Sequence, residues 1–182
     1  DYRSSPFVTA GDRLYLVGCQ DGYFPDLGWH VAGEMGGIWA HPIKLMDGFS
    51  ASLQKENNPA PDCLPPAERF TNYPLAGQHF YELRELDAQV WRTQFVPDGL
   101  PGLVVEYLIA NQSTESARFT FRFNGMTDLR PVWLGERTGM TDAPDTLNFV
   151  EELSAFHARD RQNEWHLFFG ADRPADAHST VP

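Results

Sequence analysis

The side chains that could carry chemistry are concentrated in one glycine-rich segment, residues 20–49 (QDGYFPDLGWHVAGEMGGIWAHPIKLMDGF). Glycines let the backbone turn sharply or approach another group closely, and no clean helical or strand period runs through the segment. Flat aromatic rings can stack on the apolar faces of sugar rings, while carboxylates, imidazoles and ammonium groups bond the hydroxyls. The segment therefore predicts a carbohydrate-binding surface. The candidate residues are Tyr23, Trp29, His30, Glu34, Trp39, His41, Lys44 and Asp47.

Most of these residue types also suit purely structural roles. Trp29 and Trp39 could equally pack in the core or against a neighbouring domain. Glu34 paired with Asp47 or Asp26 could perform acid–base chemistry at a glycosidic bond, but this needs two carboxyl groups at a defined separation across a cleft. The same acids often cap turns by accepting hydrogen bonds from backbone amides, and this is the preferred interpretation.

Metal, nucleophile and phosphate chemistry have less support. Glycines around Glu34 disfavour a helix that would place it beside His30, and the segment contains neither His-x-His nor His-Glu-x-x-His. The chain also lacks a Gly-x-Ser-x-Gly motif and the Lys-Ser/Thr of a phosphate-binding loop. Cys19 and Cys63 are expected to be two separate thiols. The sequence thus predicts no metal site and no cofactor.

Composition and charge narrow the class of protein. Of the 182 residues, 42% are hydrophobic and 13% aromatic, which is typical of a folded globular domain. The formal net charge of −11 argues against nucleic acid or an anionic membrane as a partner. The longest apolar runs are too short to span a bilayer. We expect residues 1–172 to form one domain and residues 173–182, which are polar and contain proline, to form a linker to a further domain.

Short alternating runs predict strands. In residues 118–123 (RFTFRF), three Phe occupy one face and polar residues the other, which is the period of a half-buried strand. This run and residues 90–96 and 103–109 predict an antiparallel meander. Residues 147–159 also suit a helix, but we favour a strand that forms a hairpin with residues 164–170. Further strands are expected at residues 13–18, 38–43, 49–53 and 79–86.

Proline and glycine separate these runs. Residues 57–66 (NNPAPDCLPP) contain four Pro and predict an extended surface loop. Many short strands separated by such turns are typical of two packed antiparallel sheets, with the phenylalanine-rich faces filling the space between them. The sequence therefore predicts an all-β fold, a two-layer antiparallel β-sandwich.

Two phrases carry a resemblance to a known family: residues 36–42 (GGIWAHP) and residues 44–49 (KLMDGF), followed by the phenylalanine-rich meander and by residues 130–133 (RPVW). With them, the chain resembles the N-terminal region of bacterial proteins related to glycogen debranching enzymes. In those glycosidases a β-sandwich, often called a supersandwich, precedes an (α/α)6 catalytic barrel.

The resemblance implies that the general acid and base lie on a helical barrel, whose long amphipathic helices this sequence lacks. The chain would then be a non-catalytic N-terminal domain of a glycoside hydrolase acting on α-glucans or related oligosaccharides. Its partners would be carbohydrate and a downstream (α/α)6 catalytic domain of the same polypeptide, and it would contribute to the rim of the substrate cleft. A periplasmic or secreted location is also implied.

Two other functions remain open. The chain could be a free-standing carbohydrate-binding module that holds a glucan without a partner domain. It could instead be a self-sufficient β-sandwich enzyme, such as a sugar epimerase or lyase, but only if His30, His41 and Glu34 converge in one pocket.

Overall fold

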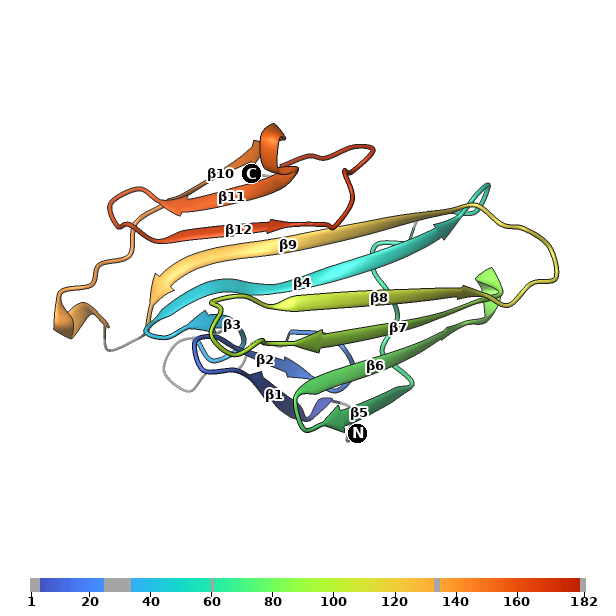
Figure 1. Ribbon diagram of the computed structural model, residues 1–182, viewed down its shortest axis with the longest axis horizontal. Coiled ribbons are helices and arrows are strands. Elements are labelled where there is room, and N and C mark those ends of the chain that lie inside the picture. Colours follow the sequence, from blue (N-terminus) through green and yellow to red (C-terminus); the bar gives the residue numbers. More distant parts are fainter. Residues whose placement is uncertain (1–3, 25–33, 60, 133–134, 181–182) are drawn as a thin grey trace.

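The fold is all-β, as predicted. The computed structural model describes residues 4–24, 34–59, 61–132 and 135–180 (Figure 1). Within these residues, twelve strands form three antiparallel sheets. Helical structure in the same residues is confined to short 3-10 turns, among them η2 (Arg84–Leu86), η3 (Gly135–Thr138) and η4 (Glu151–Leu153).

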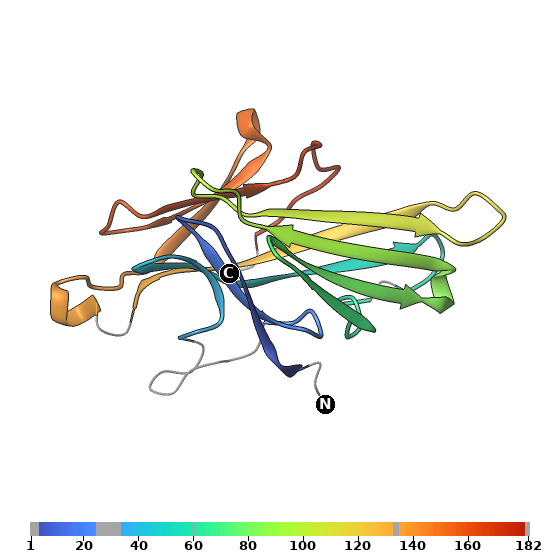
Figure 2. The same cartoon turned by 60° about the horizontal axis from the view of Figure 1, so that its bottom comes forward.

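The two larger sheets are named A and B here. Sheet A has the order β1 (Pro6–Ala10), β2 (Tyr15–Cys19), β3 (Gly37–Ala40), β4 (Ile43–Lys55) and β9 (Phe119–Pro131). Sheet B has the order β5 (Arg69–Tyr73), β6 (Ala76–Leu83), β7 (Ala88–Phe95) and β8 (Val104–Asn111). Sheet C, the third, consists of β10 (Asp145–Val150), β11 (Ala155–Asp160) and β12 (His166–Gly170). The long pair β4 and β9 underlies the other two sheets: Figure 2 shows sheet B (green) along one end of this pair and sheet C (orange to red) towards the other.

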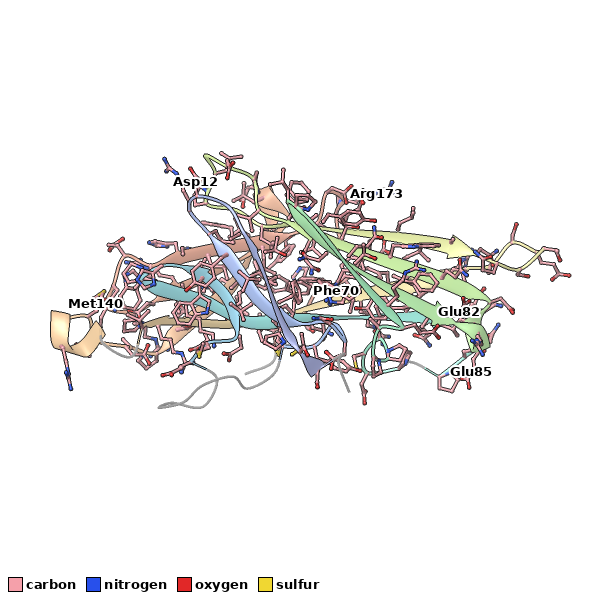
Figure 3. The ribbon with its side chains drawn as sticks, turned by 90° about the horizontal axis from the view of Figure 1, so that it is seen from below. Asp12, Phe70, Glu82, Glu85, Met140 and Arg173 are labelled. Carbon is pink, nitrogen blue, oxygen red and sulfur yellow. The ribbon has the colours of Figure 1, made fainter. Side chains whose placement is uncertain are left out.

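Two hydrophobic clusters hold the layers together. One joins Ala51 and Leu53 of β4 to Tyr81 and Val90 of sheet B, so the apolar faces of sheets A and B meet as a sandwich. The other contains residues of sheet A, against which Phe169 and other side chains of sheet C pack. Phe70 of β5 packs against β1, where its ring centroid lies 4.6 Å from that of Phe7 (Figure 3 labels Phe70).

The pairing predicted for the third strand of the meander is wrong. β7 and β8 pair as expected, but β9 pairs with β4 over the register from Phe119–Lys55 to Pro131–Ile43. The chain crosses from sheet B to sheet A between Asn111 and Phe119. In this position the odd-numbered Phe side chains of β9 face the sandwich interior, where Phe121 meets Tyr107 of β8 and Phe123 meets Phe49 of β4.

A second correction concerns residues 38–43, predicted as one strand. β3 ends at Ala40 and β4 begins at Ile43, because the chain reverses at His41 and at Pro42, whose peptide bond is cis. β4 then continues for 13 residues and includes the predicted strand at residues 49–53.

The predicted hairpin with residues 164–170 is confirmed in part, because β11 pairs with β12. Residues 147–159 are not one strand as predicted: they contribute to β10 and β11, which η4 separates and which pair with each other. Residues 57–66 carry no strand or helix where they are described, as expected for the proline-rich loop. In the tail predicted as a linker, His178 stacks on Phe149 with a centroid distance of 3.6 Å. That part of the tail packs against sheet C.

Gly37 shows why the segment is rich in glycine. Its φ is +97°, a conformation that side chains with a Cβ rarely adopt, and a Cβ here would collide with the backbone carbonyl of Met46. The close approach of β3 to the bulged part of β4 therefore requires glycine at this position.

Replacing Gly37 with Ala should destabilise the fold by more than about 2 kcal/mol, because the methyl group adds backbone strain and a steric collision. Gly102→Ala is the matched control, since nothing lies within 4 Å of a Cβ at that position. The control should change stability by less than about 0.5 kcal/mol. Urea unfolding measures both variants, and equal midpoints for the two would contradict this account.

Candidate functional site

The structure describes six of the eight predicted binding residues, and only some of these are accessible. Trp29 and His30 lie outside the described residues, as does Asp26. Tyr23 is 39% exposed, and His41 is exposed at the turn between β3 and β4. Glu34 is half-buried just before β3.

Trp39 belongs to the core. It is only 4% exposed, its Nε1 donates a hydrogen bond to the carbonyl of Gly36 at 3.2 Å, and its ring lies parallel to that of Tyr15 at 6.3 Å. A sugar cannot stack on an indole sealed in this way. The packing interpretation that the sequence left open therefore describes Trp39.

Lys44 is also buried, at 1% exposure, and its ammonium group is held by carboxylates. It forms an ion pair with Asp47, and its Nζ lies 3.9 Å from a carboxylate oxygen of Asp128. Burial raises the pKa of Asp128, although Arg130, at 2.9 Å from the same oxygen, favours the charged form. Asp47 is 52% exposed, so one carboxylate of this group reaches the surface while the lysine does not. The group links β4 to β9.

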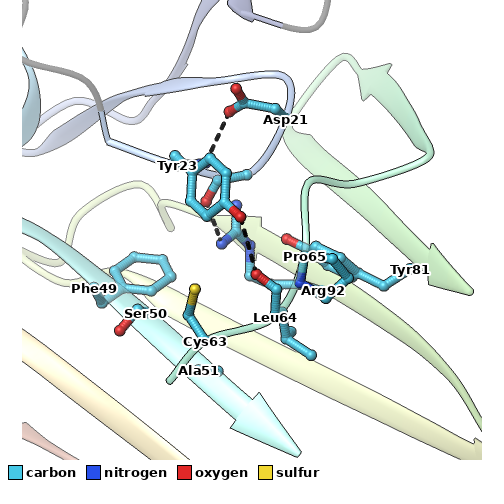
Figure 4. A pocket seen from close by; sticks show the side chains of 11 residues that line it. Asp21, Tyr23, Phe49, Ser50, Ala51, Cys63, Leu64, Pro65, Tyr81 and Arg92 are labelled. Carbon is cyan, nitrogen blue, oxygen red and sulfur yellow. Dashed lines mark hydrogen bonds between the residues drawn. The ribbon is translucent and has the colours of Figure 1, made fainter. Parts of the chain in front are cut away.

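Tyr23 lines a different hollow, drawn in Figure 4. Its hydroxyl donates to the carbonyl of Leu64 at 3.2 Å, and its backbone N–H donates to a carboxylate oxygen of Asp21 at 3.0 Å. Arg92, Tyr81 and other residues complete the lining. The cavity volume is about 20 Å³, which is room for about one water molecule. This hollow is too small for a sugar.

Below the hollow lies a buried polar network that the sequence analysis did not assign. His79 has no exposed surface, and its Nε2 lies 3.1 Å from the carbonyl oxygen of Cys19. Arg92, 4% exposed, donates to the carbonyl of Gly22 at 2.9 Å and to Gln94 at 3.2 Å, and its Nη2 lies 3.1 Å from Nδ1 of His79. Its guanidinium also lies over the ring of Phe49 at 5.3 Å.

No carboxylate among the described residues forms an ion pair with Arg92, so carbonyl and amide oxygens, imidazole and an aromatic face stabilise its charge. The signal for this network was present in the sequence. His79 and Arg92 occupy the same parity in β6 and β7 as the apolar Tyr81 and Val90, so alternation alone places them inside. Burial is the main cause that lowers the pKa of His79 to about 3, and the neighbouring Arg92 lowers it further.

Other chemistries find no site in the described part of the chain. No cluster of three or more His, Cys, Asp or Glu side chains there is placed to hold a metal ion. Cys19 and Cys63 are separate thiols, the first buried and the second exposed. None of the described helices has the length and apolar character of a membrane span.

A further surface stands out on β9. Phe121 and Phe123 are 38% and 40% exposed although they point toward the interior of the sandwich. The ring of Phe121 lies 4.8 Å from that of Tyr107 on β8, and the ring of Phe123 lies 5.4 Å from that of Phe49 on β4. We call these two phenylalanines with Tyr107 the open aromatic edge. β8 and β9 each end their sheet, so the sandwich is unclosed on this side.

Comparison with known proteins adds no identity: no family model, curated protein or solved structure matches this chain. The function is therefore argued from the surfaces themselves.

The buried network makes a pH prediction. The pKa of His79 is about 3 in the fold and about 6.5 in the unfolded chain, so the unfolded state binds the extra proton first as the pH falls. The stability that neutral His79 supplies is complete above pH 6.5 and is lost as the pH falls from 6.5 toward 3. The loss should be roughly 1.4 kcal/mol per pH unit.

His79→Gln keeps a polar group in the network but cannot be protonated in this range. Urea unfolding of this variant between pH 7 and pH 4 should show a shallower decline than that of the unaltered chain. Parallel declines would show that His79 does not titrate in this way.

Proposed function

We propose that this chain is a non-catalytic β-sandwich module of a carbohydrate-active protein. It packs against an adjoining catalytic module through its open aromatic edge. The resemblance of the sequence to the N-terminal region of debranching-enzyme-related glycosidases motivates the choice of a glycoside hydrolase acting on α-glucans or related oligosaccharides. The adjoining module is then a helical (α/α)6 barrel of the same polypeptide.

The observation that carries the proposal is the exposure of inward-facing aromatic side chains. Phe121 and Phe123 occupy the positions of a sandwich core but keep over a third of their surface in water. Burying apolar surface contributes roughly 25 cal/mol per Å². A second protein surface that covers these rings would therefore be bound with a favourable free energy. The two edge strands offer unpaired backbone groups beside the rings, which a neighbouring polypeptide can use.

A second support comes from what the described residues lack. They contain only 3-10 turns as helices, and the hollow beside Tyr23 holds about one water molecule. Neither feature provides the deep cleft with two carboxyl groups that glycosidic hydrolysis requires. The acid and base are accordingly assigned to the adjoining module.

The contribution to carbohydrate binding is assigned to the exposed members of the predicted set. His41 lies at the β3–β4 turn, Asp47 lies on β4 beside the start of β3, and Tyr23 lies on the chain that leaves β2. These groups can reach a ligand in a cleft between modules. Trp39 and Lys44 are buried, and their role is to hold the β3–β4 turn in place. The alternative enzyme built on His30, His41 and Glu34 has no observation in its favour.

The purified chain should be folded and should release no reducing sugar from amylose or maltoheptaose, because the acid and base are absent from it. Turnover above that of a heat-denatured sample would contradict the proposal. The reading frame should also encode the barrel, and a frame without a helical module would contradict the proposal independently.

The open aromatic edge has its own test. When the chain is mixed with the barrel encoded beside it, the two should co-elute in gel filtration. Phe121→Thr with Phe123→Thr should weaken this association at least tenfold, a loss of about 1.4 kcal/mol or more. Phe168→Thr is the matched control, since Phe168 is 52% exposed on sheet C and should not matter. Equal association of both variants would exclude the edge as the interface.

A further inference from the structure

Sheet B presents a second surface that is unrelated to the glycine-rich segment. Burial alternates along β6 and β7, with His79 and Val90 on the buried side and the residues between them partly exposed. Because successive side chains of a strand point to opposite faces, the partly exposed residues share one face. We call it the outer face of sheet B. It consists of the odd-numbered residues of β5 and β7 and the even-numbered residues of β6 and β8.

Strand register arranges the aromatic residues of the outer face in two rows. In the first row, Phe80 lies directly opposite Trp91, and their ring centroids are 5.2 Å apart. In the second row, Tyr73 and Phe95 flank Ala76. Tyr73 is 49% and Phe95 is 38% exposed. Trp91 and Phe95 are four residues apart on β7, so the rows are about 13 Å apart.

A row of hydrogen-bonding groups lies between the two aromatic rows. Gln78 and Thr93 are opposite one another, and the amide of Gln78 donates to the Thr93 hydroxyl at 2.9 Å. Thr71 lies opposite Gln78 on its other side. These amide and hydroxyl groups retain further donor and acceptor capacity. An aliphatic protein surface laid over this row would leave those groups unsatisfied, whereas a ligand rich in hydroxyl groups would satisfy them.

The charged residues of the outer face of sheet B favour a neutral ligand. These charged residues are Arg69, Glu82 and Glu106. Arg69 lies over the ring of Phe80 at 4.9 Å, and Glu82 accepts a hydrogen bond from Gln89 at 2.9 Å. The face has no cluster of basic residues, and the chain as a whole carries a net charge of −11, so nucleic acids, anionic lipids and acidic polymers are repelled.

From these observations we infer that the outer face of sheet B binds a soluble, neutral glycan chain. Trp91 stacks against one sugar ring beside Phe80, over whose ring Arg69 lies, Phe95 with Tyr73 stacks against another, and Gln78 and Thr93 bond hydroxyls between them. The planes of the Phe80 and Trp91 rings differ by 48°, so the pair does not form one flat platform. A single flexible glycan chain fits this uneven surface better than the flat face of a crystalline polysaccharide. The inference concerns a different surface from the open aromatic edge and stands without the packing proposed above.

The test is calorimetric titration of the purified chain with three neutral soluble probes, namely amylose, arabinoxylan and cellohexaose. At least one probe should bind. For that probe, Trp91→Ala should raise the dissociation constant about tenfold, which corresponds to the roughly 1.4 kcal/mol of one lost aromatic contact. Phe168→Ala, which removes an exposed aromatic ring from sheet C, should leave the constant unchanged.

Trp91 packs on Phe80, so a second variant guards against a folding defect. Tyr73→Ala alters an exposed residue at the end of an edge strand, and it should weaken binding a few-fold without changing the melting curve. Absence of binding by all three probes would overturn the inference and would indicate that a polypeptide covers this face. Binding that both variants retain would also overturn it. Binding to microcrystalline cellulose in preference to the soluble probes would contradict the single-chain ligand.

Discussion

The structure depends above all on the pairing of β9 with β4. This antiparallel pair runs from Phe119–Lys55 to Pro131–Ile43 and is the longest in the molecule's described part. Sheet B packs along one end of it, and sheet C packs on it where Phe169 approaches Gly125. Because β9 crosses into sheet A, its phenylalanine row faces the interior of the sandwich. Since neither β8 nor β9 has a further neighbour in its sheet, the same pairing leaves part of that row in water.

Two kinds of buried polar group accompany this scaffold. Lys44 pairs with Asp47 on its own strand and joins β4 to β9 through Asp128, and Arg92 with His79 joins β6 and β7 to the loop after β2. Removing one partner from such a group leaves a buried charge or donor unsatisfied, which costs more than the contact itself contributes. These groups therefore fix how the sheets and loops fit together. They explain why Lys44, His79 and Arg92 are buried although their side chains are polar.

The sequence predicted local features well and long-range ones less well. Alternation in residues 118–123 and in β6 to β8 is a local property, so strands and their buried faces could be read from it. The partner of β9 could not, because adjacent strands usually pair and only packing across the whole sandwich places β9 beside β4. Residues 38–43 have the composition of one strand, but the turn at His41 and Pro42 divides them between β3 and β4. Trp39 suited core and ligand equally, and only its burial separates the two roles.

The account's central claim is that the open aromatic edge is covered by a neighbouring module in the whole protein. Amide hydrogen exchange, compared between this chain alone and the polypeptide that includes the adjoining module, tests this most directly. The account predicts that amides of β8 and β9 around Tyr107, Phe121 and Phe123 exchange more slowly in the longer polypeptide, while those of β12 do not change. Equal exchange along β8 and β9 in both samples would contradict it.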